Sequence, residues 1–387
     1  MTEASRRRPS HTVLVAHPSA ELYGSDRVML ESVSGLVDDG WRVVVTVPTD
    51  GPLLAELRAR GASVELCPSP VLRKNVLTPR GFARFVRTSV ASTVQGMSLL
   101  RRERPALVYV NTITVPLWPV LARLAGAPVL THVHEGEASA SRLMRRLLAL
   151  PLFLSQTLLV NSRFSAGVLS ASFGSLGRRA QVVYNAVPGP ARRTPPRAQL
   201  AGPLRVTYIG RLSPRKGVDV AVDAVARLRD RGVHAELDVV GSVFPGYEWY
   251  QEELAASVGA KDLGERVRFH GFQPSVWDIV GSGDVVVVPS RVDEPFGNTA
   301  VEALLAARPV IASATSGLLE ATAGYRAAVT VTPDDAAALA DALERTVGAW
   351  EATAEAVTAD AAEAERRHSV AAYRTRIAAL ARAAARR

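Results

Sequence analysis

The sequence repeats one pattern twice: short apolar runs alternate with longer segments whose apolar residues recur at helical spacing. Parallel strands need long crossover connections, usually helices, so this alternation predicts parallel sheets covered by helices. Strands are expected at 12–16, 41–47, 63–67, 107–110, 129–132 and 157–160, and again at 205–209, 235–240, 267–270, 284–288 and 310–312. We therefore predict an α/β chain of two Rossmann-like domains, each with a doubly wound parallel sheet.

A segment rich in Pro and Gly separates the two sets of strands. It starts at Val187, reads VPGPARRTPPRAQLAGP and has no periodicity, as expected for a linker. We place the first domain at 1–187, the linker at 188–203 and the second domain at 204–365. Residues 366–387 form a C-terminal helix that can pack back on the first domain. In such a pair, the carboxyl ends of both sets of strands can face a central cleft.

Composition favours a folded cytoplasmic protein. Hydrophobic residues make up 48% of the 387 residues, and the single cysteine, Cys67, excludes an intramolecular disulfide. The N-terminus has no apolar run long enough for a signal peptide. The most apolar later stretch, Leu147–Val160, is interrupted by Pro151 and is shorter than the ~20 residues of a membrane span. We expect a cytoplasmic location, soluble or peripheral on the inner face of the membrane.

The net charge of +9 belongs to the first half. Residues 1–190 carry 22 basic and 12 acidic residues, whereas residues 191–387 carry 24 and 25. This asymmetry predicts an anionic partner, such as an anionic membrane surface or a phosphorylated acceptor, with nucleic acid not expected. A solvated arginine-rich helix face is the alternative. One apolar stripe in this region can lie in a bilayer interface or pack on a sheet: Phe82, Val86, Val90, Val94 and Met97.

Two cations follow the first strand of the second half. In VTYIGRLSPRKGVDVAVDAV, residues 206–225, the strand ends at Gly210, and Arg211 and Lys216 lie in a short loop before a helix that opens near Val218. A guanidinium, an ammonium and helix amides at one strand end can bind a diphosphate. Two surface cations in a turn are the alternative interpretation.

Two carboxylates follow a later strand. In residues 289–320, Glu294 lies in a loop and Glu302 lies eight positions on, about one turn into a helix that Asn298 or Thr299 can cap. Carboxylates accept hydrogen bonds from sugar hydroxyls, and Gly297 lets backbone approach a ligand closely. Alone, Glu302 can be a helix N-terminal carboxylate and Glu294 a solvated loop residue.

These segments resemble the retaining glycosyltransferases of family four, which have the GT-B fold with two facing Rossmann-like domains. The family's G-R-x(4)-K loop and E-x(7)-E motif both match in spacing. The resemblance implies that Arg211 and Lys216 hold the donor diphosphate and that Glu302 holds the ribose. It also implies further donor-binding positions. Glu294 and backbone of Phe296, Gly297, Asn298 and Thr299 would hold the sugar, Gly210 would close the phosphate loop, and Phe272 in FHGF would lie near the nucleobase.

The first domain resembles the family more loosely. The family's Gly-Gly loop appears as Tyr23-Gly24, which implies that amides near Gly24 face the phosphates, and Ser25 can cap the next helix. A strand-end histidine of the family is matched by His134, with His132 as the second choice, and its implied role is to touch the donor sugar. Asn185 begins Asn-Ala-Val where the family usually has Asn-Gly-Val.

The resemblance implies a hexosyltransferase-like enzyme that moves a sugar, with retention, from a nucleoside-diphosphate sugar to an acceptor hydroxyl. The acceptor would be a glycan, a lipid-linked molecule or a small molecule, and the role would be cell-surface polysaccharide or glycolipid synthesis. No Asp-x-Asp triplet and no metal-ligand spacing occur in the sequence, so we expect no metal and no cofactor.

Two alternatives remain open. One is another nucleotide-sugar enzyme of the same fold, such as a 2-epimerase or a phosphorylase, although the additional groups that those reactions need are not identifiable. The other is a non-catalytic nucleotide-sugar-binding protein. The presence of both cations and both carboxylates argues against the second.

Overall fold

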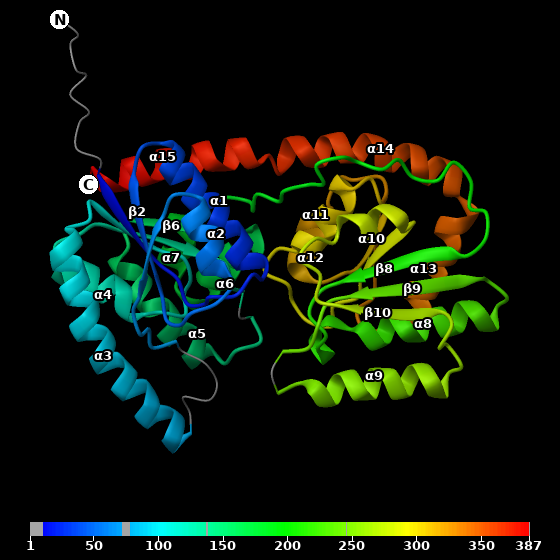
Figure 1. Cartoon of the computed structure of the whole chain (residues 1–387), viewed down its shortest axis with the longest axis horizontal. Helices are drawn as coiled ribbons and strands as arrows, with labels where there is room; N and C mark the ends of the chain where they lie inside the picture. The colour runs from blue at the N-terminus through cyan, green and yellow to red at the C-terminus, as the bar shows by residue number, and fades with distance from the viewer. Residues whose placement is uncertain (1–10, 72–77, 137, 245, 387) are drawn as a thin grey trace, which may run out of the picture. The chain divides into compact units, whose positions relative to one another are not determined.

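A computed structural model of the chain (Figure 1) describes residues 11–71, 78–136, 138–244 and 246–386. The chain forms two compact units. The first contains the residues up to Ala186 together with those from Val370 onward, and the second runs from Val187 to Ser369.

The first unit contains a seven-stranded, all-parallel sheet in the order β3-β2-β1-β4-β5-β6-β7. Its strands are β1 (Thr12–Ala16), β2 (Arg42–Val47), β3 (Ser63–Leu66), β4 (Leu107–Val110), β5 (Val129–Val133), β6 (Thr157–Val160) and β7 (Ala180–Val182). The strand order reverses between β1 and β4. In open α/β sheets, ligands bind outside the carboxyl ends of the strands at such a reversal.

Helices cover both faces of this sheet (Figure 1). They are α1 (Gly24–Asp38), α2 (Leu53–Ala59), α3 (Pro79–Glu103), α4 (Leu117–Leu124), α5 (Arg142–Ala149), the 3₁₀ helix η2 (Leu150–Leu154), α6 (Arg163–Ser172), α7 (Gly174–Arg179) and α15 (Val370–Ala385). Side chains of a strand alternate between faces. Val13 and Val15 therefore pack with α1, α2 and α15, whereas Leu14 packs on the other face with α3 and α4.

The second unit contains a six-stranded, all-parallel sheet in the order β10-β9-β8-β11-β12-β13. The strands are β8 (Leu204–Ile209), β9 (Ala235–Val240), β10 (Val267–Gly271), β11 (Val285–Val288), β12 (Val310–Ser313) and β13 (Ala328–Val331). Its helices are η3 (Pro214–Lys216), α8 (Val218–Asp230), α9 (Glu248–Ala260), α10 (Trp277–Ser282), α11 (Asn298–Leu305), α12 (Ser316–Thr322), α13 (Ala336–Gly348) and α14 (Trp350–Arg367).

The predicted fold class, two doubly wound parallel α/β sheets, is confirmed. Sequence analysis missed β7 and β13, which are edge strands of three and four residues. Their side chains are mostly exposed or half-buried, so they lack the continuous apolar run that marks a central parallel strand.

Two predicted helix caps are wrong. Ser25 lies inside the first turn of α1, which begins at Gly24, and the Asp26 carboxylate instead accepts a hydrogen bond from the Tyr23 amide at 2.8 Å. The start of α11 has Gly297 at the N-cap, and neither Asn298 nor Thr299 caps it.

Candidate active site

The phosphate loop predicted after β8 is held against the end of β11. Gly217 has a φ of +67°, and a Cβ there would lie 2.0 Å from the Pro289 carbonyl oxygen. Only glycine therefore fits this close backbone approach. The Arg291 guanidinium adds further ties, because it donates to the Pro214 carbonyl at 3.2 Å and pairs with Asp219 at the start of α8.

The Lys216 and Glu294 side chains of the two predicted motifs also meet in an ion pair. Lys216 Nζ lies 2.7 Å from Glu294 Oε1, although the residues are far apart in sequence. Glu294 is buried and also accepts a hydrogen bond from Ser290 Oγ at 2.8 Å. Burial alone would raise the pKa of the Glu294 carboxyl, but the charge and hydrogen bond of Lys216, with the Ser290 bond, outweigh it and hold that pKa below its ordinary value. Glu294 is thus a carboxylate, an acceptor for hydroxyl groups.

Arg211 is exposed beside the same loop. Its guanidinium lies over the Phe244 ring, 4.7 Å from the ring centroid, and its carbonyl oxygen accepts a hydrogen bond from the Tyr208 hydroxyl at 2.9 Å. Gly210 lies between them with a φ of +152°. A Cβ on Gly241 would lie 1.9 Å from the Gly210 carbonyl oxygen, so the loops after β8 and β9 touch through backbone. Sequence analysis missed Phe244, which has no motif of its own.

The loop that carries Glu294 is packed against the start of α12. Gly317 donates its amide to the Glu294 carbonyl at 3.1 Å, and a Cβ on Gly317 would lie 2.1 Å from that oxygen. Gly297 has a φ of +113°, which a non-glycine residue rarely adopts. These two glycines fix the backbone that leads into α11, where the amides of Asn298 and Thr299 occupy the first turn.

Three further residues that were predicted to bind the donor lie in the second unit. Glu302 lies on α11 and is half-buried. The Phe296 side chain is buried, with its ring 5.6 Å from that of His368, so only its backbone can face a ligand. Phe272 follows β10 and is 54% exposed. The roles of these residues toward a ligand remain predictions.

In the first unit, polar side chains follow three neighbouring strands. His17 follows β1, Asn111 follows β4 and His134 follows β5, and all three are buried. Asn111 links the two histidines, with its Nδ2 3.2 Å from His17 Nδ1 and its Oδ1 3.1 Å from His134 Nε2. His17 Nε2 in turn lies 2.8 Å from Asp26 Oδ1 on α1. Gly24 begins the same helix.

Sequence analysis singled out His134 in this group and missed the other three residues. The available signal was a polar residue directly after each of two apolar strands. Their mutual contacts could not be anticipated, because His17 and Asn111 are far apart in the sequence.

His132 has a different environment from His134. It lies inside β5, its Nδ1 is 2.8 Å from the Tyr109 hydroxyl, and burial lowers its pKa to about 3. It therefore belongs to the core. His134 lies just beyond the strand end, and burial, with the nearby His132 and His17, lowers its pKa well below the ordinary value. Asn185 is also buried in this unit.

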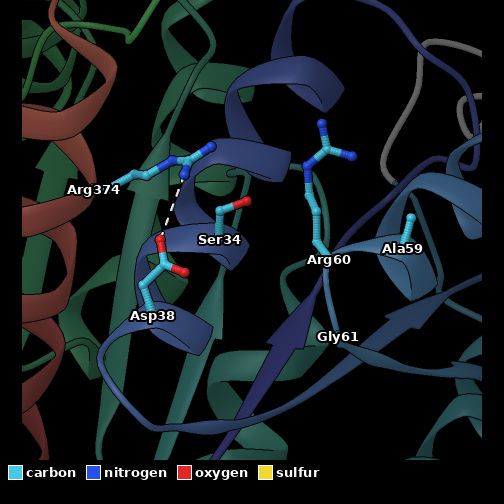
Figure 2. A pocket seen from close by; sticks show the side chains of 6 residues that line it. All are labelled: Ser34, Asp38, Ala59, Arg60, Gly61 and Arg374. Atoms are coloured by element: carbon cyan, nitrogen blue, oxygen red, sulfur yellow. Dashed lines mark hydrogen bonds and ion pairs between the residues drawn. The ribbon is translucent and has the colours of Figure 1, made fainter.

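A separate pocket of about 610 Å³ lies in the first unit and contains none of the predicted site residues (Figure 2). It is lined by Ser34, Asp38, Ala59, Arg60, Gly61 and Arg374. Both of its arginines are already paired. Arg374 contacts Glu31 and Asp38, and Arg60 contacts Glu56. Each arginine of the pocket is therefore already engaged with a carboxylate of the protein.

Within the described residues, no group of three or more His, Cys, Asp or Glu side chains is placed to hold a metal ion. None of the described helices is long and apolar enough to cross a membrane.

Two family models match most of the chain. Residues 23–188 match the model described as "Glycosyltransferase Family 4", and residues 203–348 match "Glycosyl transferases group 1". The chain is a family-four glycosyltransferase. A curated relative, the 2-deoxystreptamine glucosyltransferase of Streptomyces kanamyceticus, is 29% identical over 307 residues, which are 72% of this glycosyltransferase and 77% of the relative.

Solved structures agree on the fold. The HepE protein of Anabaena in complex with UDP-glucose has a TM-score of 0.82 and 21% identity over 96% of this glycosyltransferase and all of that chain. The sucrose-phosphate synthase of Thermosynechococcus elongatus has a TM-score of 0.75 and 19% identity, covering 96% and 98% of the two chains. At such identities the likeness establishes the GT-B fold alone.

Proposed function

We propose that this glycosyltransferase moves a hexose, with retention of configuration, from a nucleoside-diphosphate sugar to an acceptor hydroxyl. The observation that carries the proposal is the contact between Lys216 and Glu294, with Arg211 on the same loop as Lys216. It combines groups suited to a diphosphate with a carboxylate suited to a sugar hydroxyl. The similar HepE structure holds UDP-glucose, so uridine donors are the first to test.

Lys216 would contact both Glu294 and the diphosphate of the donor. Its ammonium has three N–H donors, so it can keep Glu294 and also donate to a phosphate oxygen. Arg211 would fork onto the diphosphate, Glu294 would accept a sugar hydroxyl, and Glu302 would accept the ribose hydroxyls. Backbone at Gly24, Gly210 and Phe296–Thr299 would donate to the ligand, and Phe272 would lie near the base.

The chemical step follows from the leaving group. The bond between the anomeric carbon and the diphosphate oxygen breaks, and its electron pair stays on the diphosphate, where the cations stabilise the charge. The acceptor oxygen forms its bond on the same face of the sugar, and its proton passes to the leaving phosphate oxygen. No protein nucleophile, metal or cofactor takes part in this scheme, so we expect activity to survive a chelator.

The stereochemical course is tested with purified enzyme and a panel of nucleoside-diphosphate hexoses. NMR of the product formed at early times should show the same anomeric configuration as the donor. A product of opposite configuration would exclude the retaining mechanism. Epimerised nucleotide sugar in place of a glycoside would favour the 2-epimerase alternative.

We propose further that the acceptor is lipid-linked and that the first unit docks on an anionic membrane at its inner face, in cell-surface glycan or glycolipid synthesis. The support is one layer of helices, hereafter the α3–α5 layer, made of α3, α4, α5 and η2. Its members share contacts: α4 packs against α3 and η2, and η2 packs against α5.

The α3–α5 layer is apolar on its solvent side as well as on its core side. Leu148 and Leu152 pack in the core, whereas Leu143, Leu147 and Leu150 are more than half exposed. Of the predicted α3 stripe, Val86, Val90 and Val94 are exposed and Met97 is half-buried, while the side chains of Phe82 and Arg84 lie outside the described residues. The exposed apolar side chains form a second apolar face, which does not contribute to the core of the first unit.

The charge of the α3–α5 layer favours a lipid surface over a neutral partner. Its four helices contain nine arginines and a single acidic residue, Glu103. Arginines interspersed with exposed leucines are typical of helices that lie in a bilayer interface, where each surface-bound cation adds about 1 kcal/mol with anionic lipid.

A further inference from the structure

Four buried side chains of the first unit form a linear chain of hydrogen bonds that ends at His134. In order, they are Asp26 on α1, His17 after β1, Asn111 after β4 and His134 after β5. None is more than 6% exposed. This series of hydrogen bonds lies where the strand order reverses, between β1 and β4.

The chemistry of Asp26 determines where each proton of this chain resides. Asp26 Oδ2 accepts the Tyr23 amide hydrogen at 2.8 Å, and Oδ1 faces His17 Nε2. An aspartate carboxylate can only accept, so His17 Nε2 carries the hydrogen. His17 Nδ1 then has a lone pair, which accepts from the Asn111 amide group. The carbonyl oxygen of Asn111 is thereby directed at His134 Nε2, which must donate.

His134 Nδ1 takes part in none of these hydrogen bonds. It is buried, and within the described residues it has no hydrogen-bond partner. The backbone of His134 is fixed as well, since its amide donates to Glu135 Oε2 at 3.0 Å and its carbonyl accepts from Asn161 Nδ2 at 3.3 Å.

We infer that Asp26, His17 and Asn111 are positioning residues that hold His134 in the tautomer protonated at Nε2, so that Nδ1 presents a lone pair to a hydroxyl group of the bound donor sugar. The inference rests on the proposed function for the identity of the ligand. A lone pair repels a phosphate oxygen and accepts a hydroxyl hydrogen, so His134 faces the sugar and not the diphosphate. The low pKa of His134 keeps the ring neutral, as an acceptor requires.

An isosteric change at the far end of the chain tests the inference. In Asp26→Asn, the Tyr23 amide retains the carbonyl oxygen of the substituted side chain, so the new NH₂ group points at His17 Nε2. His17 must then carry its proton on Nδ1, Asn111 must turn over, and His134 Nε2 becomes an acceptor. The proton of His134 therefore moves to Nδ1, three hydrogen bonds from the substitution.

The measurement is ¹⁵N NMR of the full chain labelled at histidine ring nitrogens, without any ligand. The wild-type protein should show His134 with a protonated Nε2 and a lone-pair Nδ1, and Asp26→Asn should exchange the two. His134→Gln assigns the signals. Asp238→Asn is the matched control, because Asp238 Oδ1 lies 2.6 Å from His270 Nε2 in the second unit. It should alter His270 and leave His134 unchanged.

A wild-type His134 protonated at Nδ1, or an unchanged His134 in Asp26→Asn, would overturn the inference. If Asp26→Asn does not fold, Asn111→Leu gives a second reading. It removes both bonds of Asn111 and keeps the branched shape of the side chain, so both tautomers of His134 should then appear, and a single tautomer protonated at Nε2 would be contrary evidence.

Binding and turnover test the ligand half of the inference. With UDP-glucose as the first donor probe, Asp26→Asn should lower kcat/KM about tenfold, as for loss of one hydrogen bond, and leave the Kd for UDP unchanged, since UDP lacks the sugar. Equal weakening of UDP binding would place His134 at the phosphates and overturn this half. Failure of the wild-type enzyme to use any nucleotide sugar would instead count against the proposed function, and the tautomer result would stand apart from it.

Discussion

At the scale of single residues, Lys216 and Glu294 depend on each other. Sequence spacing identified each within its own motif, but the 2.7 Å contact between them could not be predicted, because it is made by the packing of two loops. The contacts of Arg211 with Phe244 and of His17 with Asn111 also depend on tertiary packing, and sequence analysis identified only Arg211 among these four residues. Residue type and strand-end position predict which groups collect at a site, and tertiary packing decides which of them touch.

Removing either Arg211 or Lys216, the two cations of the loop after β8, should impair turnover. Only the removal of Lys216 should also destabilise the fold. Arg211→Ala and Lys216→Met should each lower kcat by ~10²–10³-fold, as for loss of one donor to the leaving group. Lys216→Met also leaves the buried Glu294 carboxylate without its cation, which should reduce the free energy of unfolding by ~1–3 kcal/mol. Arg211 is exposed, so Arg211→Ala should not.

Denaturant unfolding and steady-state kinetics measure both effects. The control is the double variant Lys216→Met with Glu294→Gln, which should recover part of the lost stability because no buried charge remains. Unchanged turnover in both single variants would show that the loop does not bind the diphosphate.

Glu294 should also give the fold a distinctive acid sensitivity. Its pKa in the folded protein lies below the ordinary value of 4.5. Its ionised form therefore stabilises the fold at pH above 4.5, and this contribution is lost as the pH falls below 4.5 through the folded pKa. In Glu294→Gln, the free energy of unfolding should fall less steeply below pH 4.5 than in the wild-type protein. Urea unfolding across this pH range checks the slope, and equal slopes would contradict the pairing.

At the scale of elements, the central strands and long helices were predictable because their apolar periodicity is strong. Helix starts were less predictable. Sequence analysis expected side-chain caps at Ser25 and at Asn298 or Thr299. Instead, the Asp26 carboxylate accepts the Tyr23 amide at the start of α1, and Gly297 is the N-cap of α11. Glycine is needed where the backbone closely approaches residues that are distant in the sequence, so the local sequence does not reveal the need.

Gly217 illustrates such a requirement and gives a prediction. Gly217→Ala combines a left-handed φ with a Cβ placed 2.0 Å from the Pro289 carbonyl oxygen. The loop that carries Arg211 and Lys216 must therefore move. Gly232→Ala is the matched control, since Gly232 has a φ of +78° and open space around its Cβ position. Gly232→Ala should cost about 1 kcal/mol of stability and leave kcat/KM intact. Gly217→Ala should cost more and lower kcat/KM at least tenfold, as for a misplaced catalytic group. Similar effects of the two changes would mean that the left-handed φ alone, and not the close contact with Pro289, explains the need for glycine at position 217.

The α3–α5 layer gives a second prediction at this scale. The wild-type protein should co-sediment with vesicles that contain anionic lipid, weakly with neutral vesicles, and less at high salt. Leu143→Glu combined with Leu147→Glu should abolish binding, because two exposed leucines on α5 become charged. Leu66→Glu combined with Val329→Glu is the control, with equal added charge at exposed apolar positions outside the layer. Equal loss in both pairs, or no binding to anionic vesicles at low salt, would exclude docking by this layer.

At the scale of the whole molecule, the two units differ in how the chain supplies their cores. The second unit is one continuous segment, whereas the first needs α15 from the far end of the chain. On α15, Tyr373 and Ile377 are buried with Val28, Val33 and other α1 residues, and the Tyr373 hydroxyl lies 2.8 Å from Ser32 Oγ. A Cβ on Gly35 would lie 2.7 Å from the Arg374 carbonyl oxygen, so α1 and α15 touch through backbone. The C-terminal helix is therefore part of the core of the first unit.

This arrangement predicts that a change near the C-terminus will weaken the unit formed mainly by the N-terminal half. Ile377→Ala should lower the stability of the first unit by ~2–5 kcal/mol, because Ile377 is 1% exposed and its loss leaves a cavity between α15 and the sheet. Arg376→Ala, one position earlier on the exposed side of α15, should change stability by less than about 0.5 kcal/mol. Hydrogen exchange followed by peptide mass spectrometry separates the units: peptides from β1, β2 and α1 should lose protection in Ile377→Ala, and peptides from β8 to β13 should keep it. Loss of protection spread evenly over both sheets would show that the two units unfold as one, and that α15 is not specific to the first.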